Sequence, residues 1–133
     1  QNTSSIFHKR MNQKIIDRMT NIAISAAEQC GNDFIPKIHS PIELEQILNL
    51  NDEETKFILY YEKAKLDSKI DIKITDYKKV IILIGPEGGF TESEYSQISQ
   101  KSLVLSLGEN ILRTETASIC AVHELNRLIR STL

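Results

Sequence analysis

Apolar positions recur every three to four residues in two long segments of the chain, and this spacing predicts two amphipathic helices. The first covers residues 11–30, after which Gly31 supplies a stop signal. The second begins at Thr114 and continues to the end of the chain. Its apolar face consists of Ala117, Cys120, Ala121, Leu125, Leu128 and Ile129. We therefore expect one long helix near each end of the chain.

Three short apolar runs between these helices predict β-strands. Residues 57–61 and 80–84 are rich in β-branched or aromatic side chains and are almost continuously apolar. Such runs are typical of central strands in a parallel sheet that is covered on both faces. Residues 103–105, Leu-Val-Leu, predict a third strand.

Two capping patterns predict shorter helices among the strands. Ser40, Pro41 and Glu43 supply a capping serine, a proline for the first helical position and a glutamate that closes a capping box, so we expect a helix to about residue 48. Thr91 and Glu94 form a second capping box, which predicts a helix to about residue 100. Residues 62–79 are charged and weakly patterned, and they receive no assignment. Strands and helices that alternate in this way predict an α/β fold.

Length and composition indicate one globular domain across residues 1–133. The chain is 41% hydrophobic and 26% charged, and a chain of this size buries about two-thirds of its unfolded surface. No apolar run approaches the roughly 18 residues that a membrane span needs, and polar residues 1–5 do not resemble a secretory signal. We expect a soluble, cytoplasmic protein without a membrane partner.

The balance of charge does not by itself indicate a nucleic-acid partner. The formal net charge is −2, from 16 Lys and Arg against 18 Asp and Glu. A local basic cluster near the start, which is either a solvated face or a phosphate-binding track, consists of Lys9, Arg10, Lys14 and Arg18. Cys30 and Cys120 lack metal-ligand spacing, so we expect buried free thiols and no metal site.

Two loops carry the candidate chemistry. Residues 84–90, Ile-Gly-Pro-Glu-Gly-Gly-Phe, follow a predicted strand, at the place where open parallel sheets bind ligands. Their glycines allow a flat ligand to lie against the backbone, although a sharp strand-to-helix turn needs the same residues. The segment contains neither a P-loop nor a Rossmann fingerprint. In the second loop, Arg113 and Glu115 flank Thr114 next to exposed apolar residues, which indicates either a ligand site or an ordinary capped helix start.

These two loops together resemble a known family. Residues 82–90 with Glu94 downstream, Leu107-Gly108, and residues 111–117 are similar to the motifs of the small-subunit ribosomal RNA methyltransferase E family. Residues 23–31 also resemble that family's first long helix. The likeness covers most of the chain and is least diagnostic over residues 33–56 and 62–77.

The resemblance implies a SPOUT-class α/β domain: a parallel sheet with helices on both faces, a C-terminal trefoil knot and a homodimer. Fold rules alone steer a reader away from knots, so the knot rests wholly on the likeness. The family also has a barrel-like RNA-binding domain and a strand ahead of the first long helix, and we expect both to be absent from this chain. The implied reaction is methylation of N3 of a uridine in 16S ribosomal RNA or the small ribosomal subunit, with S-adenosylmethionine as cofactor.

The resemblance further implies which residues hold the cofactor, mainly through backbone groups of three loops. They are Leu59, Tyr60, Ile84, Gly85, Glu87, Gly88, Gly89, Leu107, Gly108, Ile111, Leu112 and Thr116. At Gly88 in particular we expect a backbone conformation or a ligand approach that a Cβ would obstruct.

Methylation at N3 requires loss of the imide proton, which places negative charge on the flanking carbonyl oxygens. Arg113 is the candidate to stabilise that charge, and Glu115 or Glu87 the candidate to take the proton. The alternatives are that Arg113 and Glu115 pair with each other, that Glu87 bonds its own turn, and that solvent removes the proton. Two other functions stay open, a methylase of ribose 2′-hydroxyls and a non-catalytic dimerisation or nucleotide-binding module.

Overall fold

The computed structural model describes residues 13–50, 52–64 and 76–132 of the chain. The chain divides into two compact units, Gln1–Ile47 and Leu48–Leu133. The first contains helix α2, and the second contains a three-stranded sheet with helices α4 and α5. A short helix, α3, spans the boundary between them.

Helix α2, Gln13–Cys30, confirms the first long helix, and its predicted start at residue 11 lies outside the described residues. It ends where the sequence places the stop. Gly31 has a left-handed φ of 65°, and its N–H donates to the Glu28 carbonyl at 3.3 Å while the Asn32 N–H donates to the Ala27 carbonyl at 2.9 Å. This pair of bonds is a Schellman motif, which satisfies the carbonyls that the helix end leaves free.

Helix α3, Leu44–Leu48, begins later than predicted. The Glu43 N–H donates to the Gln46 side chain at 3.1 Å, and the Glu43 carbonyl accepts from the Gln46 N–H at 3.0 Å. The reciprocal cap is therefore built on Glu43 and Gln46, and the predicted start at Ser40 and Pro41 is wrong. The helix begins after Glu43 because the Glu43–Gln46 pair satisfies the backbone N–H groups of both residues.

The sheet consists of β1 (Thr55–Tyr60), β2 (Lys79–Ile84) and β3 (Ser102–Leu105), all parallel, in the order β2-β1-β3. This confirms the three strands and the parallel sheet. The prediction that β2 is a central strand is wrong within the described residues, because β2 pairs with β1 alone. A continuous apolar run indicates that both faces of a strand are covered. It does not show whether another strand pairs along each of its two edges.

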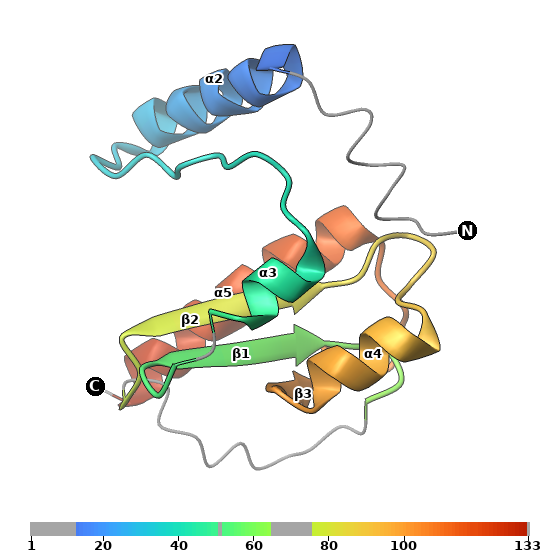
Figure 1. Ribbon diagram of the computed structural model, residues 1–133. Coiled ribbons are helices and arrows are strands. Elements are labelled where there is room, and N and C mark those ends of the chain that lie inside the picture. The colour runs from blue at the N-terminus through green and yellow to red at the C-terminus, as the bar shows by residue number, and fades with distance from the viewer. Residues whose placement is uncertain (1–12, 51, 65–75, 133) are drawn as a thin grey trace. The chain divides into compact units, whose positions relative to one another are not determined.

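Helices cover both faces of the sheet. Helix α5, Thr114–Thr132, contributes Ala121 to a core that it shares with Ile58, Tyr60 and Leu105 of the sheet. Helix α4, Glu92–Ser99, contacts β3, and its Thr91–Glu94 capping box forms as predicted. Figure 1 shows α5 behind the strands and α4 in front of them. Because strand side chains alternate, Phe57 and Leu59 face away from the Ile58 core, and both are fully buried.

The two cysteines are free, but the prediction that both are buried is wrong. Cys30, at the last residue of α2, is exposed, and Cys120 is half-buried. Apolar spacing placed both on a helical face without showing how much of that face is covered. Among the described residues, no group of three His, Cys, Asp or Glu side chains is arranged to hold a metal ion. In the same part of the chain, no helix is long and apolar enough to cross a membrane.

Candidate functional site at the carboxyl edge of the sheet

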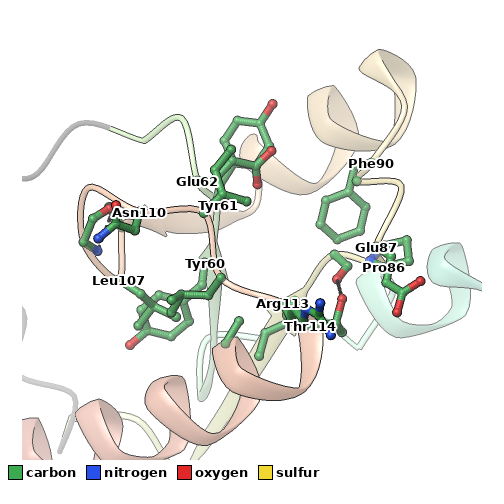
Figure 2. A pocket seen from close by; sticks show the side chains of 18 residues that line it. Tyr60, Tyr61, Glu62, Pro86, Glu87, Phe90, Leu107, Asn110, Arg113 and Thr114 are labelled. Atoms are coloured by element: carbon green, nitrogen blue, oxygen red, sulfur yellow. Dashed lines mark hydrogen bonds between the residues drawn. The ribbon is translucent and has the colours of Figure 1, made fainter.

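The carboxyl ends of parallel strands meet at one edge of a sheet, and the segments that follow them close a single cleft here. The cleft has a volume of about 520 Å3 and is built from residues 60–62, 84–90 and 106–117 (Figure 2). Its lining comprises Tyr60, Tyr61, Glu62, Ile84, Gly85, Pro86, Glu87, Gly89, Phe90, Ser106, Leu107, Gly108, Asn110, Ile111, Leu112, Arg113, Thr114 and Ala117.

The glycine-rich segment after β2 forms a tight turn. The Gly89 N–H donates to the Pro86 carbonyl at 2.8 Å, and Gly89 has a left-handed φ of 70°. Gly88 is exposed, does not have a positive φ and has no atom within 4 Å of where a Cβ would stand. The special backbone conformation expected at Gly88 is therefore wrong, and the conformational requirement falls one residue later, on Gly89. A β-turn places its glycine requirement by dihedral angle, which spacing alone does not show.

At Gly85 the requirement is steric. A Cβ added there would lie 3.1 Å from Cε2 of Phe90, which is tighter than ordinary van der Waals contact. The absence of a side chain lets the Phe90 ring fold back over the start of the turn. The Gly85 carbonyl accepts a hydrogen bond from Thr114 Oγ1 at 3.1 Å, so the same residue also joins this turn to the start of α5.

The segment after β3 is shaped by hydrogen bonds between the Ser106 side chain and the backbone of Gly108. Ser106 Oγ donates to the Gly108 carbonyl at 2.9 Å and accepts from the Gly108 N–H at 3.2 Å, while Gly108 has a φ of 136°. The Tyr61 N–H donates to the Leu105 carbonyl at 2.9 Å, which extends the pairing of β1 and β3 by one residue into the cleft. A side-chain hydroxyl therefore holds the segment after β3, and a backbone hydrogen bond holds the start of the segment after β1.

Arg113 stands where helix α5 begins. Its carbonyl accepts the Ala117 N–H at 2.8 Å, which makes Arg113 the N-cap residue, and its side chain is exposed. No ion pair joins Arg113 to Glu115 or to another residue of the described part of the chain. The guanidinium and the positive end of the helix dipole thus occur together at the cleft.

Tyr60 and Tyr61 point in opposite directions, as consecutive strand residues do (Figure 2). The Tyr60 ring lies in the core against α5, where burial first and the Glu124 carboxylate second raise its pKa to about 12. Its buried hydroxyl has no hydrogen-bond partner among the described residues. Tyr61 instead remains half-buried beside the cleft.

Most of the predicted site residues are brought together by the fold. Those lining the cleft are Tyr60, Ile84, Gly85, Glu87, Gly89, Leu107, Gly108, Ile111, Leu112 and Arg113. Four do not line it. Leu59 is fully buried within the fold, on the face of the sheet opposite Ile58, and Gly88, Glu115 and Thr116 are exposed outside the lining.

Eight lining residues were not among the predicted site residues. They are Tyr61, Glu62, Pro86, Phe90, Ser106, Asn110, Thr114 and Ala117. Each lies just after a strand end, in one of the loops of the cleft or at the start of a helix. Parallel sheets bind ligands beyond the carboxyl ends of their strands, and this rule predicts all eight positions. Tyr61 and Glu62 lie in the segment that follows β1, which carries no glycine motif in the sequence.

The fold and the cleft define an α/β domain with a cleft at the carboxyl edge of a parallel sheet, which is where such sheets bind ligands. The chain belongs to the RNA methyltransferase domain family, whose model matches residues 1–126. The family predicted from the two loop motifs is thereby confirmed.

Individual relatives agree with this membership. The Ribosomal RNA small subunit methyltransferase E of Buchnera aphidicola is 37% identical over 90% of this chain and 47% of its own length. The protein of the same name from Bacillus subtilis is 30% identical over 83% of this chain and 46% of its own length. The chain therefore spans about half the length of these relatives.

Two solved structures share the fold. The Ribosomal RNA small subunit methyltransferase E of Neisseria gonorrhoeae, bound to S-adenosyl methionine, is 33% identical and superposes with a TM-score of 0.73 over 86% of this chain and 48% of that chain. A Legionella pneumophila protein whose structure contains the bound cofactor SAM is 38% identical, with a TM-score of 0.69 over 86% of this chain and 46% of that chain.

Proposed function

We propose that this chain is the S-adenosylmethionine-binding part of an enzyme that methylates N3 of a uridine in 16S ribosomal RNA. The observation that carries the proposal is the convergence of the three loops on one cleft, at the edge where parallel sheets bind ligands. Two structural relatives, at 33% and 38% identity, were solved with this cofactor bound.

The residues of the cleft suit such a cofactor. A volume of about 520 Å3 lies within the roughly 300–1,000 Å3 of small-molecule sites. The half-buried side chains of Ile84, Leu107 and Leu112 offer apolar contact for a flat adenine, while backbone groups of the two glycine-bearing loops supply donors and acceptors. When bound, S-adenosylmethionine supplies a methyl group on a cationic sulfonium, so the protein's task is mainly to position donor and acceptor.

The uridine needs two further groups, a cation and a proton acceptor. The exposed guanidinium of Arg113, which has no ion-pair partner in the described part of the chain, is suited to stabilise negative charge on the uracil oxygens. Glu87 lines the cleft whereas Glu115 does not, so the position of Glu87 favours it to take the N3 proton.

We also propose a trefoil knot in this region, a homodimer and a cytoplasmic location beside the small ribosomal subunit. Membership of the RNA methyltransferase domain family supports the knot, and the Thr114–Gly85 hydrogen bond joins two loops of this region. The exposed apolar residues Ile119 and Val122 on α5 support a partner subunit.

Two measurements test the proposed function. Calorimetry on this chain is expected to give saturable binding of S-adenosylhomocysteine, and the absence of heat at millimolar ligand for a folded sample would overturn it. Methyl transfer from labelled cofactor to small ribosomal subunits, followed by nucleoside analysis, is expected to yield 3-methyluridine. A ribose-methylated product would favour the 2′-hydroxyl alternative, and an Arg113→Gln variant should lose transfer while it still binds S-adenosylhomocysteine.

A further inference from the structure

An aromatic pair lies beside the end of β1. The rings of Tyr61 and Tyr95 have centroids 4.4 Å apart and planes inclined at 31°. Tyr61 lines the cleft, and Tyr95 belongs to α4. In Figure 2 the Tyr61 and Phe90 rings lie on one side of the cleft and Arg113 lies on the other.

The Tyr95 ring is held on a well-capped helix. The Thr91 side chain accepts from the Glu94 N–H at 3.2 Å, and Glu94 Oε2 accepts from the Thr91 N–H at 2.8 Å. The Tyr95 N–H donates to the Thr91 carbonyl at 2.9 Å in the same turn. Because the capping box at the N-terminus of α4 is reciprocal, its first turn is fixed, and Tyr95 is a firm support for the ring of Tyr61.

Tyr61 is equally constrained at its backbone. Its N–H donates to the Leu105 carbonyl at 2.9 Å, immediately beyond the end of β1. A half-buried aromatic ring that is fixed at its backbone, backed by a second ring and placed beside a cleft offers a ready stacking surface. A flat base can join such a surface without ordering it first, since the ring has already lost its freedom.

We infer that Tyr61 stacks on the target pyrimidine base, with Tyr95 as its positioning residue. The inference rests on the proposed function, which supplies a base as the methyl acceptor. An enzyme that acts on a base must hold that base out of its stack, and aromatic side chains commonly provide the replacement contact. A base against Tyr61 occupies the same cleft as Arg113, the group proposed to stabilise charge on the base oxygens.

The test uses this chain, saturated with S-adenosylhomocysteine, and hexauridylate as the probe. The chain contains no Trp and four Tyr, so its intrinsic emission comes from tyrosine, and stacking on Tyr61 is expected to quench it. A hexameric abasic ribose-phosphate strand is the matched ligand, because it keeps the phosphates and lacks the bases. We expect hexauridylate to bind and quench, and the abasic strand to bind much more weakly.

Variants then locate the contact. Tyr61→Ala is expected to weaken hexauridylate binding by about fivefold to a hundredfold, the range that base stacking on an aromatic ring supports. Tyr61→Phe keeps the ring and should retain the affinity. Tyr95→Ala should weaken hexauridylate binding by a smaller factor, and Tyr95→Phe, which keeps the ring, should bind like the parent. Tyr77→Ala, which removes a tyrosine outside the cleft, should leave the affinity for hexauridylate unchanged. Thermal melting of each variant checks that it is folded.

Binding of S-adenosylhomocysteine, measured separately by calorimetry, separates the two proposals. If the parent chain does not bind it, the proposed function fails and the inference fails with it. If the parent binds it but does not distinguish hexauridylate from the abasic strand, only the inference is overturned. The inference is also overturned if Tyr61→Ala binds hexauridylate like the parent, or if it loses S-adenosylhomocysteine to the same degree, which would assign the ring to the cofactor.

Discussion

Thr114 Oγ1 donates a hydrogen bond to the Gly85 carbonyl at 3.1 Å, across 29 positions of the chain. Thr114 is the first residue of α5, and Gly85 begins the turn that follows β2. One side chain thereby connects the two loops that carry the sequence motifs. The contact explains how a threonine that looks like a simple helix start also shapes the cleft.

Replacement of this threonine by valine keeps its shape and removes the hydrogen bond. We expect Thr114→Val to lower the free energy of unfolding by about 0.5–1.5 kcal/mol. We also expect the affinity for S-adenosylhomocysteine to fall by about threefold to tenfold, because the two loops lose their connection. Thermal denaturation and calorimetry measure the two effects. Thr114→Ser should retain both properties, and Thr116→Val, outside the cleft, should alter neither. Parent-like affinity in folded Thr114→Val would contradict the role of this bond.

The turn after β2 provides a matched pair of glycines. Gly89 has a φ of 70°, which costs a non-glycine residue about 1–2 kcal/mol, whereas Gly88 does not have a positive φ. Gly89→Ala is therefore expected to reduce cofactor affinity by about fivefold to thirtyfold, if the strain is relieved by a change of the turn. Gly88→Ala should bind like the parent. Calorimetry on both variants decides this, and equal affinities for the two would show that the turn does not shape the site.

The buried hydroxyl of Tyr60 predicts an unusual response to alkaline pH. The pKa of Tyr60 is raised to about 12, chiefly by burial, whereas the ordinary value is 10.0. Above pH 10 the unfolded chain loses this proton and the folded chain keeps it, so the free energy of unfolding falls as the pH rises toward 12. Below pH 10 both states are protonated and this group contributes no pH dependence.

Tyr60→Phe removes this contribution and also removes a hydroxyl with no described hydrogen-bond partner. At neutral pH we expect the variant to be as stable as the parent or more stable by up to about 1 kcal/mol. The stability difference in its favour should widen above pH 10. Urea unfolding at several pH values measures the difference, and a constant value from pH 8 to pH 11 would disprove the account.

The exposed apolar residues of α5 predict where a second subunit binds. The predicted face from Ala117 to Ile129 is mostly used within the subunit, since Ala121, Leu125, Leu128 and Ile129 pack on the sheet. Ile119 and Val122, at 72% and 54% exposed, lie outside that core. We expect the Ile119→Glu, Val122→Glu double variant to be monomeric in light scattering at concentrations where the parent is a dimer.

A control variant for this experiment is Ile42→Glu, which changes an isoleucine that is 50% exposed in the other unit of the chain. It should leave the dimer intact. A parent chain that is monomeric at tens of micromolar, or a double variant that remains a dimer, would refute the assignment of this surface.

Local sequence signals determined much of the secondary structure, because they depend on neighbouring residues alone. The Thr91–Glu94 capping box and the stop at Gly31 both form as predicted, since a cap is satisfied within a few residues. The apolar runs likewise predicted the three parallel strands. The glycine turn and the segment before α5 were recognised as ligand loops because each follows a strand end, and both do line the cleft.

Tertiary structure decided what depends on distant partners and on dihedral angles. The edge position that β2 has among the described strands and the exposure of Cys30 both depend on what packs beside them. Gly89 rather than Gly88 carries the positive φ, although Gly89 is the last residue of the turn that its N–H closes on the Pro86 carbonyl. The Tyr61–Tyr95 pair joins residues 34 positions apart, and only the packing of α4 beside the end of β1 brings their rings together. Sequence spacing describes neighbours along the chain, whereas these features arise from neighbours in space.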